Sequence, residues 1–168
     1  MTADRVALTV AVVAFGAGMS LLMLRGWRSR QRRQADLPPP PSVPAAAADV
    51  VAGPVAGLFV GTTFREDWLD RVAVHGLSSR APGWLTVRTD GVLLERERVA
   101  DLWFPHAVLH GARVGDALAG KVVGGGGLLL LDWELGGRDV SSAFRAEDAA
   151  EHQRLAAVVS RLTVREAS

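Results

Sequence analysis

The feature that most constrains this chain is an uncharged apolar run over residues 6–24, VALTVAVVAFGAGMSLLML. A helix rises about 1.5 Å per residue, so a run of this length matches the roughly 30 Å hydrocarbon core of a bilayer. The run is apolar on every side, unlike the one-sided stripe of a helix that covers a soluble core. The sequence therefore predicts a single transmembrane helix over residues 6–24.

Basic residues follow this run at once and set its expected orientation. The only charged residues before it are Asp4 and Arg5, whereas five arginines lie within the nine positions after it. Positive charge beside a span stays on the cytoplasmic side. We therefore expect residues 1–5 outside, the helix in the cell (inner) membrane, and the rest of the chain in the cytoplasm. Five arginines are expected to contact the membrane surface: Arg25, Arg28, Arg30, Arg32 and Arg33.

Two other interpretations of the apolar run remain open, and both are disfavoured. A secretory signal peptide carries its positive charge before the apolar run and a small-residue cleavage site after it, which is not the order here. A buried helix of a soluble domain is normally followed by a packing partner. Here residues 25–50 form a basic and then Pro/Ala-rich linker that contains PPPPSVPAAAA.

Four consecutive prolines in this linker favour a stiff polyproline II tether. A ligand for an SH3-like partner is the alternative.

Charge is distributed unevenly between the two parts of the chain. Residues 1–50 hold six Arg against three Asp, a net charge of +3, whereas residues 51–168 hold thirteen Lys plus Arg against fifteen Asp plus Glu, a net charge of −2. A nucleic-acid-binding domain carries its basic excess on the folded part, so nucleic acid is not an expected partner. The chain has no cysteine, which excludes disulfides, thiolate catalysis and cysteine-ligated zinc.

Residues 51–168 are expected to form one mainly β domain that ends in a helix. The turn signal Asp90-Gly91 between two apolar runs predicts a hairpin. A short helix is expected over 66–74, and an amphipathic helix with an apolar stripe over 146–163. Runs rich in β-branched and apolar residues predict about seven short strands: 58–64, 84–88, 92–95, 101–105, 107–114, 128–135 and 139–144, with a shorter one at 121–123 and a glycine turn at 124–127.

Several segments also resemble a known family. These are GLFVGTTFREDWLDRVAVHGLSSRAPGWLTVRTDGVLL, DLWFPHAVLHGARV, AGKVV and LLLLDWELGG, followed by the closing helix. Over about residues 56–164 they are similar to bacterial, actinobacterial-type membrane-anchored PH-like proteins of unknown function, which are often described only as membrane, export or transporter proteins. The resemblance implies a partly open barrel of about seven strands, in two roughly orthogonal sheets, with one C-terminal α-helix. It implies no reaction.

The same resemblance draws attention to a basic loop. PH-like domains often bind acidic lipid headgroups through basic residues between their first two strands. The matching region of this chain alternates basic residues with Glu66, Asp67 and Asp70, and such mixed charge is typical of a solvated face. We keep three candidate contacts for a headgroup or a protein partner: Arg65, Arg71 and Arg80.

No pattern in the sequence indicates catalysis or metal binding. His106 and His110 are four residues apart, which in a strand is about 13 Å, too far for one metal ion. A helix there would bring them together and revive a zinc site. The serines lack a G-x-S-x-G turn, and the glycine run at 124–127 lacks a following G-K-[ST]. The sequence therefore predicts no catalytic, cofactor-binding or metal-binding residue, no small-molecule substrate and no enzyme.

The tryptophans of the domain are expected to fill its core. Trp103 and Phe104 are adjacent in a predicted strand and point to opposite faces, so one of them is a candidate exposed aromatic for a partner. Together these observations favour a non-enzymatic scaffold or recruiter at the cytoplasmic face of the membrane, with the bilayer and a protein as partners. The alternatives are an anionic-lipid-sensing domain, an auxiliary subunit of a membrane transport or export complex and, last, an enzyme.

Overall fold

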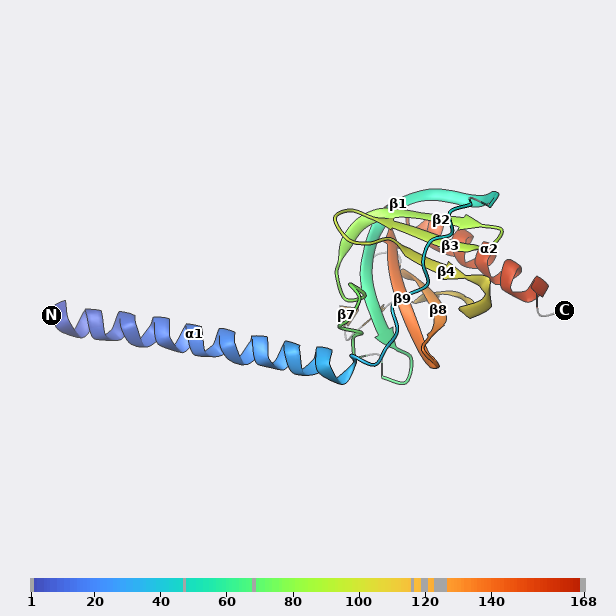
Figure 1. Cartoon of the computed structure of the whole chain (residues 1–168). Helices are drawn as coiled ribbons and strands as arrows, with labels where there is room; N and C mark the ends of the chain where they lie inside the picture. The colour runs from blue at the N-terminus through green and yellow to red at the C-terminus, as the bar shows by residue number, and fades with distance from the viewer. Residues whose placement is uncertain are drawn as a thin grey trace. The chain divides into compact units, whose positions relative to one another are not determined.

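The structure is a computed structural model that describes residues 2–46, 48–67, 69–115, 117–118, 121–122 and 127–166. The chain divides into two compact units, Met1–Asp36 and Leu37–Ser168. Each unit has its own internal contacts (Figure 1).

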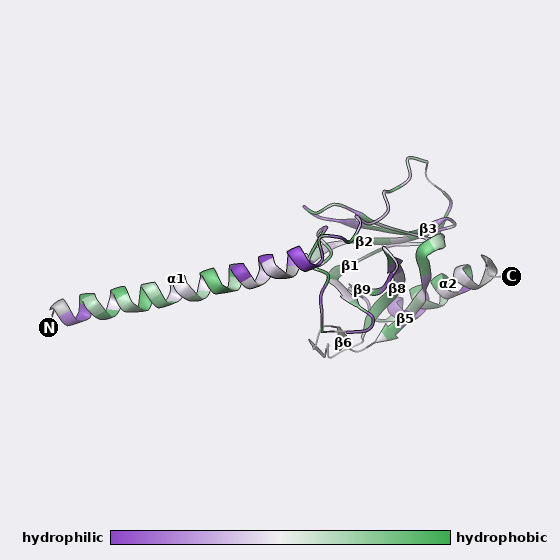
Figure 2. Cartoon of the chain, turned by 60° about the horizontal axis from the view of Figure 1, so that its bottom comes forward, coloured by the Kyte–Doolittle hydropathy of each residue, from purple (hydrophilic) through white to green (hydrophobic). Residues whose placement is uncertain are grey.

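The first unit is a single helix, α1 (Thr2–Arg33), which is long and apolar enough to cross a membrane. Figure 2 shows hydrophobic residues along most of its length and hydrophilic ones at its C-terminal end. Within the apolar run, the hydroxyls of Thr9 and Ser20 each donate a hydrogen bond of 2.8 Å to the carbonyl one turn earlier, so they need no water. The helix continues beyond the predicted span through residue 33, because arginine is a good helix former.

The second unit is an open, seven-stranded antiparallel sheet with one C-terminal helix, which confirms the predicted fold class (Figure 1). The strand order is β4-β3-β2-β1-β9-β8-β5, and β6 and β7 form a separate pair. The elements are β1 (Val50–Phe64), β2 (Ala81–Arg88), β3 (Gly91–Arg96), β4 (Leu102–Pro105), the 3₁₀ helix η1 (His106–Val108), β5 (Leu109–Gly115), β6 (Ala117–Leu118), β7 (Lys121–Val122), β8 (Leu128–Leu135), β9 (Arg138–Ala146) and α2 (Ala150–Glu166).

The long strand β1 joins the two halves of this sheet. Residues 50–59 pair with β2 and residues 57–64 pair with β9, with register shifts between residues 50 and 55 in the first pairing and between 59 and 61 in the second. At Gly57 a Cβ would lie 2.4 Å from the carbonyl oxygen of Arg145, so only glycine permits the close approach of β9. The two sheets implied by the resemblance are therefore one continuous hydrogen-bonded sheet, bent by the bulges of β1.

The core lies inside the curled sheet and is closed by α2. Phe104 of β4 and Trp133 of β8 meet edge to face, with ring centroids 5.1 Å apart, and so connect strands from the two halves. Leu155 and Val159 of α2 are fully buried against this core. The helix begins at Ala150, whose N–H donates to the Asp148 carboxylate at 2.9 Å, and this side chain is a preferred cap.

The prediction of a short helix over 66–74 is wrong, because residues 66–67 and 69–74 contain no helix. The Asp67 carboxylate accepts the Leu69 N–H at 2.9 Å, a local bond that competes with a helical turn. The Val72 N–H donates to the Thr62 carbonyl at 3.0 Å, which ties the loop to β1. Tertiary contacts with β1 therefore override the helical spacing of the apolar residues. Trp68, Val123 and Gly124–Gly126 lie outside the described residues.

The proline-rich segment expected to be a free tether lies against the domain instead. We call residues 37–43 the proline strap. Leu37 is 5% exposed and belongs to the main core cluster, and its carbonyl oxygen lies 2.8 Å from Nε2 of His75. A Cβ at Gly136 would lie 2.4 Å from Pro38, so the β8–β9 turn accepts the strap only with glycine there. Proline suits this role, because it packs apolar surface without leaving an N–H unsatisfied. The compact unit begins at Leu37, fourteen residues before the predicted boundary at 51.

Candidate functional site

A groove between the edge strand β5 and α2 is the candidate functional site of the domain. We call it the β5–α2 groove, and its volume is about 310 Å³. Three strands or strand ends and one helix contribute to it. Its lining consists of Arg65 after β1, His110, Gly111, Ala112 and Arg113 of β5, Asp132 of β8, and Ser160 and Thr163 of α2.

A bulge in β5 places His110 at the rim of the groove. The register with β8 shifts between Leu109 and Gly111, which leaves Leu109 buried and the His110 side chain 42% exposed. Because a bulge adds one residue to a strand, His110 departs from the regular alternation of side chains along β5. His110 Nδ1 lies 3.4 Å from a carboxylate oxygen of Asp139.

The floor of the groove holds a buried carboxylate whose oxygens are both bonded. Asp132 is 7% exposed, its Oδ1 accepts the Ser141 hydroxyl, and its Oδ2 accepts Nε of Arg113 at 2.9 Å. A buried carboxylate is costly unless it is paired in this way. Arg113 uses Nε for this bond, its side chain is 51% exposed, and its two terminal nitrogens take no part in the bond to Asp132.

The two hydroxyl groups of the groove are also committed as donors. The Ser160 hydroxyl donates to the Ala112 carbonyl at 3.2 Å, and the Thr163 hydroxyl donates to the Ser160 carbonyl at 3.1 Å. Arg65 is exposed, and within the described part of the chain its guanidinium has no hydrogen bond or ion pair. Within the described part of the groove, the cationic donors left over are therefore those of Arg65 and Arg113, and the His110 ring lies at the rim. A site with unused cationic donors suits an anionic ligand.

The three arginines predicted as headgroup or partner contacts do not share this site. Arg65 lines the groove, but Arg71 and Arg80 do not. Arg71 is half-buried, and its backbone forms an isolated antiparallel β-bridge with Thr63. Its guanidinium lies beside Gly61. Arg80 is exposed just before β2.

Sequence reasoning missed Arg113 because its role depends on the packing of β5 against α2. One signal was available, since Asp132 interrupts an apolar run and therefore requires a buried partner.

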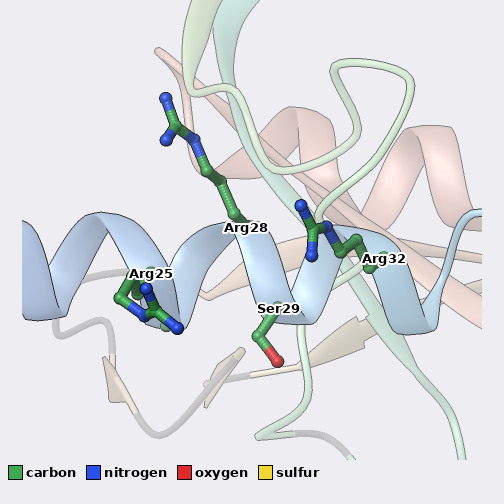
Figure 3. Close-up of a pocket in the computed structure, with 5 residues that line it drawn as sticks. Arg25, Arg28, Ser29 and Arg32 are labelled. Atoms are coloured by element: carbon green, nitrogen blue, oxygen red, sulfur yellow. The ribbon is translucent and has the colours of Figure 1, made fainter.

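The predicted membrane-surface arginines lie on the last turns of α1. Figure 3 shows Arg25, Arg28 and Arg32 around Ser29, along a shallow pocket on this stretch of helix. Positions three, four and seven residues apart share one helix face, so three positive charges are concentrated on that face. Arg33 is exposed, and the side chain of Arg30 lies outside the described part.

Arg96 of β3 is a buried cation whose contacts are structural. Its guanidinium donates to the carbonyls of Ala100 and, at 2.9 Å, Gly76, and it lies 4.9 Å from the ring centroid of Phe59. Burial lowers the pKa of Arg96 to about 10, and the nearby Asp101 carboxylate partly opposes this shift. Arg96 therefore connects the loop that contains Gly76 with the loop that contains Ala100.

Arg96→Lys is expected to lower the free energy of unfolding by about 1–3 kcal/mol. A lysine provides one ammonium in place of the planar fork, so at least one carbonyl loses a charge-assisted donor. Urea denaturation of the 37–168 fragment, followed by tryptophan fluorescence, measures this change. Arg98→Lys is the matched control, because Arg98 is exposed in the adjoining turn. Equal stability of the two variants would show that the fork contributes nothing.

The predicted exposed aromatic at Trp103 or Phe104 is wrong. Trp103 is 4% exposed beneath the guanidinium of Arg88, and Phe104 is fully buried. Trp84 of β2 is instead 43% exposed.

The zinc alternative required His106 and His110 on one face of a single helix. In the structure His106 lies in η1 and His110 in β5. The described residues contain no group of three His, Asp or Glu side chains that could hold a metal ion.

Comparison with known proteins agrees with this architecture. A family model described as bacterial PH domain-like matches residues 37–160. The match begins at the first residue of the compact unit, so it includes the proline strap as well as the sheet and most of α2. No curated protein matches the chain.

Proposed function

The chain belongs to the bacterial PH domain-like family, and from this premise we propose that it is a single-pass membrane-anchored interaction module. It recruits or scaffolds a protein partner at the cytoplasmic face of the cell membrane. The observation that carries this proposal is the combination of two units in one chain. One is a helix long and apolar enough to cross a membrane, and the other is a PH-like domain with a polar groove.

Three properties of α1 support the membrane part of the proposal. Its apolar run is free of charge over 6–24, and the hydroxyls of Thr9 and Ser20 are bonded within the helix. The arginine face follows directly, where cations meet lipid phosphates, and each basic residue near an anionic surface contributes about 1 kcal/mol. The charge order favours the arginines inside and residues 1–5 outside.

The chemistry of the groove supports binding in preference to catalysis. Catalysis requires a nucleophile, acid or base that is free to act on a substrate. The Asp132 carboxylate is already bonded to Ser141 and Arg113, and the Ser160 and Thr163 hydroxyls donate to backbone carbonyls, so His110 is the one acid or base left among the described groove residues. Residues 51–168 carry a net charge of −2, which weakens attraction to an anionic bilayer and favours a protein as the partner.

Reporter fusions at residue 168 of the full chain test the location. We expect an alkaline phosphatase fusion to stay inactive, because this reporter needs the disulfides that form outside the cytoplasm. A fluorescent protein that folds in the cytoplasm should fluoresce at the same position. The full chain should also resist alkaline extraction from membranes. Replacing the five arginines of 25–33 with glutamine is the matched control and should scramble the orientation. An active phosphatase fusion, or an extractable chain, would contradict the proposal.

A further inference from the structure

We infer that the β5–α2 groove binds an acidic side chain of a protein partner, whose carboxylate is held between Arg65 and the outer nitrogens of Arg113. This inference rests on the proposed role as a recruiter and adds the chemistry of the partner. The groove is a cavity of about 310 Å³ lined by both arginines, which is large enough for one side chain and the backbone next to it.

The unused hydrogen bonds of the groove determine the charge of the ligand. Asp132 has both oxygens bonded, and the hydroxyls of Ser160 and Thr163 have acceptors. Within the described part of the chain, the cationic groups left are the Arg65 guanidinium and the terminal nitrogens of Arg113, and both are donors. Asp132 holds Arg113 through Nε, which fixes the orientation of its fork before a ligand arrives. A carboxylate accepts such donors in a two-pronged geometry.

The floor of the groove has space for this ligand. A Cβ built on Gly111 meets no atom within 4 Å, so the bulged part of β5 is open where the ligand would lie. The β5 strand is at the edge of the seven-stranded sheet, next to α2. A peptide segment therefore reaches the arginines without displacing a strand.

The rim of the groove favours a protein over a lipid surface. Asp139 lies beside His110 and is paired across the β8–β9 register with Glu134, which is also exposed. A uniformly anionic membrane would approach these carboxylates as well as the arginines and would be repelled by them. A peptide can place its acid on Arg65 and Arg113 and a neighbouring basic residue on Asp139. The expected partner segment therefore carries an acidic residue with a lysine or arginine beside it.

A pair of synthetic tripeptides tests this inference on the full chain in nanodiscs. The probes are acetyl-Lys-Glu-Lys-amide and acetyl-Lys-Gln-Lys-amide, which differ only in the carboxylate. Binding is followed by NMR signals of the guanidinium Nε–H groups of Arg65 and Arg113 and of the backbone amides at 110–113. We expect the dissociation constant to be about tenfold lower for the Glu peptide, the size of one charge-assisted hydrogen bond. We also expect its shifts to map to the groove.

Substitutions then assign the effect to the two arginines. Arg65→Gln should bring the two dissociation constants together, and because Arg65 is exposed and its guanidinium has no bond to a described residue, the fold should be unaffected. Arg113→Lys keeps a cation near Asp132 but loses the fork, and it should reduce the preference for Glu severalfold. Arg80→Gln is the matched control, because it removes one exposed charge outside the groove and should leave the preference unchanged.

Three results would overturn the inference. One is equal binding of the Glu and Gln peptides by the unaltered chain. A second is a Glu preference that survives Arg65→Gln. The third is movement of the groove signals when the nanodisc lipid changes from zwitterionic to anionic with no peptide present, because the groove would then bind lipid. Failure of the peptide test with a cytoplasmic reporter pattern at residue 168 rejects only the inference, whereas an active phosphatase fusion rejects the proposed function.

Discussion

Leu155→Asp is expected to unfold the domain or to lower its free energy of unfolding by about 3–5 kcal/mol. The side chain is fully buried between α2 and the sheet, so the substitution removes a large apolar group and introduces a carboxylate without a partner. A domain of this size has about 5–15 kcal/mol in total, so the loss is a large fraction of its stability. Urea denaturation of the 37–168 fragment measures the change.

Gln153→Asp is the matched control for this substitution. Residue 153 is exposed on the same helix, so the same charge should change stability by less than about 1 kcal/mol. Leu162→Asp should fall between the two, because Leu162 is only partly buried against the core. Wild-type stability of the Leu155→Asp variant would mean that α2 does not close the core.

The second large effect concerns where the domain begins. A fragment of residues 37–168 is expected to be more stable than one of residues 51–168 by about 3–5 kcal/mol. The shorter fragment loses the buried Leu37 side chain, which by itself contributes about 1.5–3 kcal/mol. It also loses the Leu37 carbonyl that bonds His75 and the Asp49 carbonyl that accepts the Thr89 N–H at 2.9 Å. Urea midpoints of the two purified fragments measure the difference.

Two substitutions in the 37–168 fragment separate packing from chain length. Leu37→Ala should account for about half of the difference, because it removes the buried side chain and leaves the strap in place. Val43→Ala should change little, because Val43 is 39% exposed. Equal midpoints of the 37–168 and 51–168 fragments would show that the strap packs on the domain without stabilising it.

Local patterns were sufficient for much of the fold. The apolar run at 6–24 predicted α1, the Asp90-Gly91 turn predicted the β2–β3 hairpin, and the stripe around Leu155 predicted α2. Each of these signals lies within a few residues along the chain. The family resemblance implied a partly open barrel of about seven strands, but the strand order came only from the structure, because strand patterns alone do not specify which strands pair.

The errors arose where distant residues determine the conformation. The four prolines at 38–41 are typical of an extended tether. In the structure, however, Leu37 is buried in the core, and the absence of a side chain at Gly136 leaves room for Pro38. The bulge that turns His110 outward depends on pairing with β8. For the same reason, Arg65 is the one lining residue of the groove that the sequence analysis named as a candidate contact. Arg113 lies in the groove because β5 packs against α2 and because its Nε bonds to Asp132.

The early start of the domain limits how far it can move from its anchor. Only Gln34–Asp36 separate the end of α1 from Leu37, and these few residues extend to about 14 Å at most. A free segment up to residue 50 would reach about 60 Å. In the proposed membrane location, the short connection limits the distance between the domain and the end of α1. A partner that is itself in the membrane then meets the groove at a high effective concentration, so weak contacts suffice to hold it, whereas a freely diffusing protein has no such advantage.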